Sequence, residues 1–263
     1  MEAIIYQKEQ SKRTASLWQS ITCLCPSLAQ ADGPQVVAVT GAGGKTTCIM
    51  RLAEELVAAG KRVLVVTTTH MYKPESHGVL SNDPAVITAA LERDGLVIAG
   101  LPYGKDKIAY IGDAAYEAVC PAAQVVLVEA DGARRQPFKI PRPLEPVLPE
   151  TCDAVLCVAG LSALGKPLKS SCYGWAESEA AAERLGTTFP KETDKGSTPL
   201  TISLFAALWA RGSLAALKAY TWPVIAILNQ ADTPAQQLAG ALILQEAGLA
   251  QGLITSFAEA EVS

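Results

Sequence analysis

Residues 37–47 read VAVTGAGGKTT, an apolar run followed by three glycines, a lysine and two threonines. Apolar residues at helical spacing come next and stop at Gly60, and a second apolar run, RVLVVTTT, begins at Arg62. A strand, a glycine-rich turn, a helix and a second strand in this order form the βαβ unit of a parallel sheet. The stretch therefore predicts an α/β fold with a mainly parallel sheet and helices on both faces.

The glycine-rich turn has the composition of a phosphate-binding loop. Glycines let backbone N–H groups converge on phosphate oxygens at a helix N-terminus, Lys45 supplies a positive charge, and Thr46 supplies a hydroxyl for Mg²⁺. The common pattern G-x-x-x-x-G-K-[ST] would place a glycine at position 39, where this chain has Val39, so the loop is the shorter T-G-x-x-G-K-T-T. We predict a P-loop NTPase whose loop residues Gly41, Ala42, Gly43, Gly44, Lys45, Thr46 and Thr47 bind the nucleotide.

The alternation of helices and strands continues along the chain. Residues 1–33 are predicted to form a partly helical N-terminal extension, with one helix at about 16–24, and residues 34–263 a P-loop NTPase domain. Ligands of such sheets bind at the carboxyl ends of the strands, so polar residues at these ends are the best candidates for site residues. Further helices are predicted over 83–93, 112–119, 176–185, 199–217 and 234–247, and further strands over 96–100, 125–132, 152–160, 223–232 and 252–257.

Two carboxylates end the predicted strand VVLVEAD. Glu129 and Asp131 share a face of an extended strand, so either can hold Mg²⁺; we choose Asp131 because it lies at the strand terminus beside a glycine. Thr68, at the end of the second strand, is a further candidate for the magnesium shell, and His70 is a candidate catalyst. The predicted catalytic residues are Lys45, Asp131 and His70, and the predicted metal ligands are Thr46, Asp131, Glu129 and Thr68.

Four cations follow the acidic strand, in ARRQPFKIPRP. Such a cluster can neutralise charge in a phosphoryl-transfer transition state, hold an anionic second substrate, or form an ordinary solvated loop. The sequence leaves these alternatives open for Arg134, Arg135, Lys139 and Arg142.

The strand VIAILNQAD ends in N-x-x-D, which bears on the identity of the base. In guanine-specific NTPases the pattern is N-K-x-D, in which the asparagine orders the loop and the aspartate accepts hydrogen bonds from guanine. This chain has Gln230 in place of the lysine. Asn229 and Asp232 are therefore predicted nucleotide-binding residues, and the nucleotide is either ATP or GTP.

Composition limits the other partners. The net charge of −4 gives no global basic field, so we expect no nucleic-acid partner. Charged residues, glycines and prolines interrupt every apolar run, so we expect no membrane span. Seven scattered cysteines and the lack of a secretory signal predict a cytoplasmic protein with reduced thiols.

Several motifs in order resemble one family: GAGGKTT, VLVVTTTHM, VLVEADGARRQPFKIP, VAGLSALGKPL and VIAILNQAD. They are similar to the selenium-dependent hydroxylase accessory proteins, also called the selenium cofactor biosynthesis YqeC family, from about residue 36 to about residue 232. The resemblance implies a P-loop NTPase with a selenium-dependent molybdenum hydroxylase, or its cofactor-maturation proteins, as partner. The matching residues are Gly41, Gly43, Gly44, Lys45, Thr46, Thr47, Thr68, Thr69, Glu129, Asp131, Gly132, Lys139, Pro141, Glu145, Pro146, Gly160, Gly165, Asn229 and Asp232.

Two weaker resemblances keep other functions open. The short loop looks like that of the Mur-type ATP-dependent ligases, and the N-x-x-D strand end is similar to that of the metallocentre-maturation GTPases. The leading hypothesis is a Mg²⁺-dependent NTPase that assists maturation of selenium-dependent hydroxylases. The alternatives are an ATP-dependent ligase or kinase acting on a small anionic substrate, and a non-catalytic, nucleotide-gated cofactor carrier.

Overall fold

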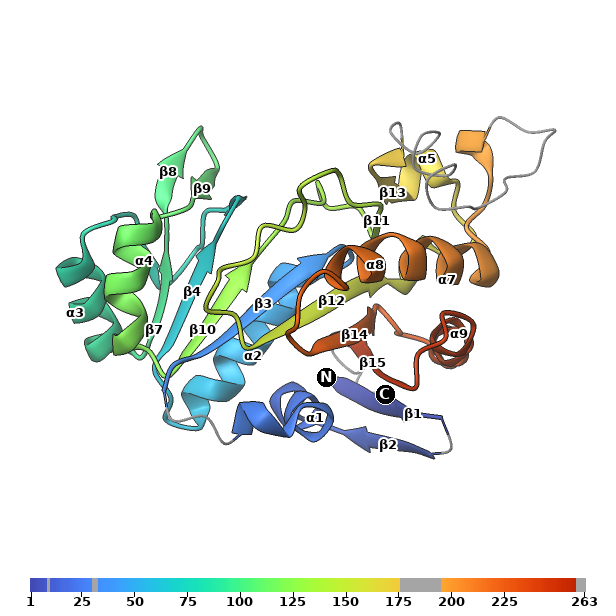
Figure 1. The fold of residues 1–263 in the computed structure, drawn as a ribbon, viewed down its shortest axis with the longest axis horizontal. Coiled ribbons are helices and arrows are strands. Elements are labelled where there is room, and N and C mark those ends of the chain that lie inside the picture. Colours follow the sequence, from blue (N-terminus) through green and yellow to red (C-terminus); the bar gives the residue numbers. More distant parts are fainter. Residues whose placement is uncertain (9, 30–32, 176–194, 259–263) are drawn as a thin grey trace.

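The computed structural model describes residues 1–8, 10–29, 33–175 and 195–258, and a ten-stranded sheet runs through its centre (Figure 1). The strand order is β2-β1-β15-β14-β12-β3-β10-β4-β7-β6. From β15 to β6 every neighbouring pair is parallel. The predicted α/β class with a mainly parallel sheet is therefore confirmed.

The strands predicted from apolar runs all lie in this sheet. Their side chains alternate between two cores: Val36 and Ala38 pack into one, and Val37 and Val39 into the other. Both faces are apolar because both are covered, as parallel sheets require. The bounds are β3 Gln35–Gly41, β4 Val63–Thr67, β7 Leu96–Ala99, β10 Val125–Glu129, β12 Ala154–Gly160, β14 Val224–Asn229 and β15 Gln251–Ser256.

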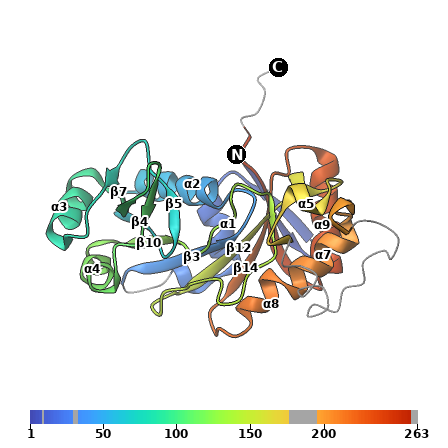
Figure 2. The ribbon, with the colours of Figure 1, turned by 90° about the horizontal axis from the view of Figure 1, so that it is seen from above.

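Helices cover both faces, as predicted. One core is closed by α1 (Leu17–Leu24) and α2 (Lys45–Ala58), with the short η1 (Pro26–Ala29) beside them. The other is closed by α3, α4, α7, α8 and α9, and Figure 2 shows α2 and α8 on opposite sides of the sheet. The bounds of these five are Pro84–Asp94, Asp113–Val119, Ile202–Arg211, Ser213–Leu217 and Pro234–Glu246.

Two predicted helices do not correspond to single described helices. The single helix predicted over 199–217 is wrong, because α7 and α8 are separate helices that meet at Gly212. A side chain at Gly212 would clash with the carbonyl oxygen of Leu208, so the glycine permits this break. The helix predicted over 176–185 lies outside the described residues.

The first residues contain strands that the sequence analysis did not predict. A hairpin of β1 (Glu2–Gln7) and β2 (Gln10–Thr14) joins the sheet, with β1 antiparallel to β15. Ala3 and Ile5 are buried and alternate with less buried neighbours. The sequence signal for this strand was therefore a short alternation of inward and outward side chains with a period of two residues. The predicted helix near residues 16–24 is confirmed as α1, whose Ser16 side chain accepts a hydrogen bond from the Gln19 N–H.

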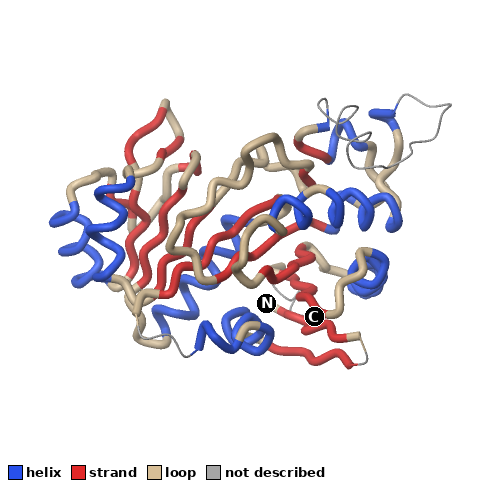
Figure 3. Tube along the Cα trace, viewed as in Figure 1, coloured by secondary structure: helices blue, strands red, loops and turns tan. Residues whose placement is uncertain are grey.

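Small strands that the sequence analysis also missed extend from the main sheet. A three-stranded antiparallel sheet consists of β5 (His70–Tyr72), β9 (Lys107–Ala109) and β8 (Leu101–Tyr103). Figure 3 shows this segment projecting from the main sheet. The remaining short elements are β6 Gly78–Val79, η2 Cys120–Ala122, β11 Phe138–Lys139, η3 Leu161–Ala163, α5 Leu168–Ser171, β13 Cys172–Tyr173 and η5 Lys195–Ser197.

Across the part of the chain that the structure describes, no helix combines the length and apolar character that a bilayer span needs.

Candidate functional site

The carboxyl ends of three central strands bring the predicted site together. In the sheet, β10 lies between β3 and β4, and Glu129 is in register with Val39 on one side and Thr67 on the other. Because the three strands are parallel, the glycine loop at the end of β3, the carboxylates at and just after the end of β10 and the threonines at and just after the end of β4 meet at one edge. The sequence predicted this edge as the location of the site.

The first half of the glycine loop is held by protein acceptors. The Gly41 N–H donates to the Asp131 carboxylate at 3.0 Å, the Ala42 N–H to the Val158 carbonyl at 2.9 Å, and the Gly43 N–H to the Gln136 carbonyl at 3.2 Å. These bonds fix the path of the loop between two neighbouring strand ends. They also mean that these three N–H groups are already satisfied.

The second half of the loop presents donors without acceptors. Within the described residues, no hydrogen-bond acceptor lies on the backbone N–H groups of residues 44–47, which form the cap and first turn of α2. The cap, Gly44, has no side chain to close the helix end. Four such N–H groups at a helix N-terminus, with the helix dipole behind them, make a site for an anion.

The glycines are required by the packing as well as by any ligand. Gly41 and Gly43 have φ values of 98° and 77°, which favour glycine. A side chain on Gly41 would overlap the Val158 carbonyl, and one on Gly43 would overlap the backbone of Gly160. Glycine at these two positions thus lets the loop lie directly against the end of β12.

A hydrogen bond between Thr46 and Glu129 connects the glycine loop to the acidic strand. The Thr46 hydroxyl donates to Glu129 Oε2 at 2.8 Å. Thr46 is exposed, whereas Glu129 is 6% exposed at the end of β10. Burial raises the pKa of the Glu129 carboxyl, although the nearby Lys45 charge and the Thr46 hydroxyl act in the opposite direction. The pair therefore places one hydroxyl and one poorly solvated carboxylate beside the free N–H groups.

Asp131 lies below the loop and is saturated by protein donors. It accepts from the Thr40 hydroxyl at 2.7 Å and the Gly41 N–H, and it pairs with Lys45 Nζ at 3.2 Å and Lys139 Nζ at 2.9 Å. Burial acts to raise the pKa of Asp131, but the two lysines and these hydrogen bonds outweigh it, so the pKa is lowered. Asp131 thus remains charged and joins the loop to the lysines.

Lys45 and Lys139 are both buried. Lys45 Nζ donates to the Gly41 carbonyl at 2.7 Å, which folds its side chain back over the loop. Lys139 Nζ donates to the Gly132 carbonyl and pairs with Glu145 at 2.8 Å, in addition to Asp131. Thr40, Lys139 and Glu145 were not among the predicted site residues, although Lys139 was noted as part of the basic run. The signal for Thr40 was a polar residue at the end of an apolar strand.

The predicted base-reading residues lie on the β14 side of the loop. Asn229 is buried; its amide donates to the Gly43 carbonyl at 2.9 Å and its oxygen accepts from the Thr255 hydroxyl at 3.0 Å. Asp232 is exposed and accepts from the Ser256 hydroxyl at 2.6 Å. Asn229 is therefore placed to order the loop, whereas Asp232 has a carboxylate open to solvent.

The side chains of two other predicted residues make contacts away from the carboxylates. The N–H of Thr68 donates to the Glu129 carbonyl at 3.1 Å, as the Thr67 hydroxyl also does, but the Thr68 hydroxyl donates to the Val147 carbonyl at 2.7 Å. His70 lies on β5, where its ring is 3.9 Å from that of Tyr103. Among the described residues, no hydrogen bond connects His70 to Glu129 or to Asp131. Thr68 as a metal ligand and His70 as a catalyst stay predictions.

The basic run contacts tyrosines of the small sheets. Arg134 and Arg142 have their guanidinium carbons 5.7 and 4.8 Å from the ring centre of Tyr173, whereas Arg135 lies 4.3 Å from that of Tyr72. The two consecutive arginines therefore contact tyrosines of two different small sheets. The next residue in the chain, Gln136, contacts the glycine loop through its carbonyl, which accepts from the Gly43 N–H.

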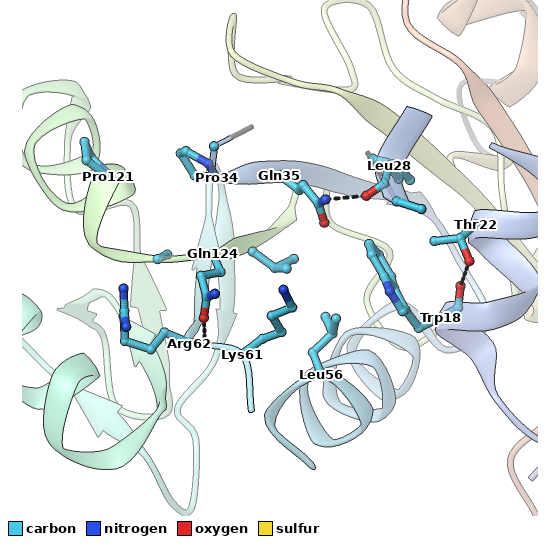
Figure 4. A pocket seen from close by; sticks show the side chains of 14 residues that line it. Trp18, Thr22, Leu28, Pro34, Gln35, Leu56, Lys61, Arg62, Pro121 and Gln124 are labelled. Carbon is cyan, nitrogen blue, oxygen red and sulfur yellow. Dashed lines mark hydrogen bonds between the residues drawn. The ribbon is translucent and has the colours of Figure 1, made fainter. Parts of the chain in front are cut away.

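A cavity of about 460 Å³ lies at the opposite edge of the sheet (Figure 4). Gln35 and Val125 line it from the amino ends of β3 and β10, Leu56 from near the end of α2, and Trp18 from α1. None of the predicted nucleotide, metal or catalytic residues lines this cavity. It is therefore separate from the site at the carboxyl edge.

These features define an α/β protein with a large, mostly parallel sheet and a glycine-rich loop at the carboxyl end of a central strand. The sequence model of a family described as YqeC protein matches residues 37–176. The chain belongs to the YqeC family, which confirms the resemblance noted from its motifs. The match contains the loop, Glu129, Asp131 and the arginines, whereas Asn229 and Asp232 lie beyond it.

One relative is an Escherichia coli (strain K12) protein named Uncharacterized protein YqeC. It is 36% identical over 151 residues, which are 55% of this chain and 59% of the relative. The chain therefore spans less than two thirds of the length of the curated relative that it matches.

Proposed function

We propose that this protein binds a nucleoside triphosphate with Mg²⁺ at the carboxyl edge of the sheet and hydrolyses it, as a P-loop NTPase. The observation that carries the proposal is the arrangement around the start of α2. Four consecutive N–H groups have no acceptor within the described residues, and the Thr46 hydroxyl beside them meets the Glu129 carboxylate at 2.8 Å. Phosphates require such donors, and Mg²⁺ prefers such oxygen ligands.

Lys45 is the proposed phosphate-binding cation. Its ammonium group already lies over the loop through its bond to the Gly41 carbonyl. When Lys45 turns toward a phosphate, Asp131 keeps Lys139 as a counter-charge at 2.9 Å, so a buried carboxylate is not left unpaired. Asp131 and Lys139 thus support the loop while Lys45 is free to bind.

Glu129 and Thr46 are the residues that we propose for Mg²⁺. Mg²⁺ is commonly held by one or two protein ligands together with waters and phosphate oxygens, so a dense acidic cluster is not required. Among the residues that the structure describes, the Glu129 carboxylate has one hydrogen-bond partner, whereas the oxygens of Asp131 accept from four groups. The geometry therefore favours Glu129 over our first choice, Asp131. A bound Mg²⁺ would supply charge neutralisation for the phosphates.

The biological role that we propose is assistance in the maturation of selenium-dependent molybdenum hydroxylases in the cytoplasm. Its support is the family resemblance of the motifs, and the partner would be the hydroxylase or its cofactor-maturation proteins. The choice between ATP and GTP stays a prediction that depends on Asp232. The carboxylate of Asp232 is exposed, which suits recognition of guanine.

A ligase or kinase acting on a small anionic substrate is the second candidate. The observation in its favour is the Gly43–Gln136 backbone contact, which attaches the segment carrying Arg134 and Arg135 to the phosphate loop. Arginines held there can bind an anionic acceptor near the terminal phosphate.

Identification of the nucleotide that copurifies with the protein, followed by titration of ATP and GTP with and without Mg²⁺, tests the proposal. We expect tight, Mg²⁺-dependent binding of one of the two. Phosphate release without any acceptor supports the NTPase, whereas release that needs a small anionic molecule supports the second candidate. Absence of binding to both nucleotides contradicts the proposal.

A further inference from the structure

The small sheet beyond β4 has two chemically different faces. Because side chains alternate along strands, Met71 and Ile108 point inward and are buried, whereas His70, Tyr72 and Lys107 share the outer face. Tyr103 of β8 pairs with Lys107 and lies on the same face. Tyr72 and Tyr103 are 45% and 52% exposed, so two phenol rings are open to solvent on this small sheet.

The outer face combines these rings with positive charge. The guanidinium of Arg135 lies 4.3 Å from the centre of the Tyr72 ring, and Lys107 Nζ lies 5.5 Å from it. His70 is stacked against Tyr103 with ring centres 3.9 Å apart. Neither Arg135 nor Lys107 has a carboxylate within ion-pair distance among the described residues. In a chain of net charge −4, this is a local excess of positive charge.

This outer face lies beside the terminal-phosphate end of the proposed nucleotide site. The first strand of this small sheet, β5, comes directly after β4 in the chain, and the Thr67 hydroxyl of β4 contacts the backbone of Glu129. Arg135 directly precedes Gln136 in the chain, and the Gln136 carbonyl accepts a hydrogen bond from the Gly43 N–H. The predicted base-reading residues are on β14, and β12 and β3 separate β14 from β10 and β4. The aromatic face is thus on the opposite side of the phosphate loop from the expected base.

We propose that the outer face of β5, β9 and β8, together with Arg135, binds a planar aromatic small molecule that carries a phosphate or carboxylate group. Tyr72 and Tyr103 provide surfaces for ring stacking, and Arg135 and Lys107 pair with the anionic group. Guanidinium that is stacked on a tyrosine keeps its in-plane N–H groups available for a bidentate contact. The role of this ligand as the second substrate rests on the proposed nucleotide site, whereas its binding does not.

Flavin mononucleotide is a suitable probe, because it joins a planar ring system to a phosphate and is fluorescent. Its affinity is measured by fluorescence anisotropy with the full chain and is compared with riboflavin, which has the ring but no phosphate, and with inorganic phosphate as competitor. We expect flavin mononucleotide to bind at least about tenfold more tightly than riboflavin. Absence of flavin mononucleotide binding, or equal binding of riboflavin, overturns the proposal.

Matched variants locate the binding. Tyr72→Ala and Arg135→Gln change exposed side chains, and each is expected to weaken flavin mononucleotide binding roughly tenfold. The controls are Tyr220→Ala, an exposed tyrosine stacked on Trp222 elsewhere, and Arg93→Gln, an exposed arginine on α3. Equal losses in the variants and the controls contradict the proposal. Circular dichroism checks that each variant is folded.

Lys45→Ala separates this proposal from the proposed function. We expect it to weaken binding of ATP or GTP roughly tenfold to a hundredfold and to leave flavin mononucleotide binding unchanged, because Lys45 is not on the aromatic face. If the parent protein binds flavin mononucleotide but no nucleotide, the proposed function fails and this site stands. If Lys45→Ala loses flavin mononucleotide binding as well, the probe occupies the phosphate loop and the aromatic site is refuted.

Discussion

The hydroxyl of Thr46, in the first turn of α2, donates a 2.8 Å hydrogen bond to Glu129 at the end of β10. The two residues are 83 positions apart in sequence. Their contact connects the glycine-rich loop to the acidic strand, and it does so beside backbone N–H groups that lack acceptors within the described part of the chain.

Glu129→Gln is expected to remove the Mg²⁺ dependence of nucleotide affinity, with a loss of roughly tenfold or more at saturating Mg²⁺. The amide keeps the size of the carboxyl but not its charge. Because the pKa of Glu129 is raised by burial, the neutral amide should leave Tm at pH 7 unchanged or higher. Calorimetric titration with and without Mg²⁺, with Glu54→Gln on the exposed face of α2 as control, measures the effect. An unchanged response to Mg²⁺ excludes Glu129 as the ligand.

Asp131→Asn is expected to lower the free energy of unfolding by about 3 kcal/mol, because the buried Lys45 and Lys139 lose a shared counter-charge. This value is at the low end of the stability loss that usually follows removal of one partner of a buried ion pair, because Lys139 keeps its ion pair with Glu145. Urea unfolding monitored by tryptophan fluorescence gives the value, and Asp94→Asn, on the surface, serves as control. A variant as stable as the parent shows that Asp131 does not hold the two lysines in solution.

Glu55 makes stability depend on pH. Its carboxylate accepts from the N–H groups of Leu17 and Trp18 and from Arg51. Burial acts to raise its pKa, but these bonds outweigh burial and lower it. A lowered folded-state pKa means that the contribution is present above the ordinary value of 4.5 and is lost as the pH falls below it.

The test for Glu55 compares urea unfolding of the parent and of Glu55→Gln between pH 7 and pH 3. We expect the variant to be about 1 kcal/mol less stable at pH 7, with a difference that shrinks as the pH falls below 4.5. Glu54→Gln is the neighbouring control. A difference that is constant over this range contradicts the assignment of the pH dependence to Glu55.

Asn229 and Asp232 should affect nucleotide binding in different ways. Asn229→Ala removes the bond to the Gly43 carbonyl and leaves the Thr255 hydroxyl without its acceptor, so affinity for ATP and GTP should fall together. Asp232→Ala should lower the affinity for GTP alone, if GTP is the ligand. Competition titrations with both nucleotides measure this. Loss of one nucleotide alone in Asn229→Ala would show that Asn229 contacts the base.

The sequence predicted the main architecture because parallel strands and the helices between them have strong local patterns. The strand β3, the start of α2 at Lys45 and the carboxylates of β10 were all located from apolar runs and the polar residues that follow them. The hairpin of β1 and β2 was missed because its strands are short and its pairing partner, β15, is at the other end of the chain. Such distant pairing leaves little signal in the local sequence.

The roles of individual site residues were harder to predict. Glu129 and Asp131 both lie near the end of one strand, so their positions in the sequence do not decide which of them binds Mg²⁺. Only the packing shows that the Asp131 carboxylate is occupied by Thr40, Lys45 and Lys139. The sequence makes His70 a candidate catalyst because it follows the threonines that end the second strand, whereas its neighbour in space, Tyr103, lies in a strand that was not predicted. Side-chain partners from separate elements are set by the tertiary fold.

Nucleotide affinity of the parent protein and of Lys45→Ala tests the central claim most directly. Isothermal titration with Mg²⁺ and each of ATP and GTP is the measurement, and Lys61→Ala, an exposed lysine just beyond α2, is the control. The proposed phosphate site predicts that Lys45→Ala loses roughly tenfold to a hundredfold in affinity while Lys61→Ala binds as the parent does. Equal affinity in all three proteins would contradict it.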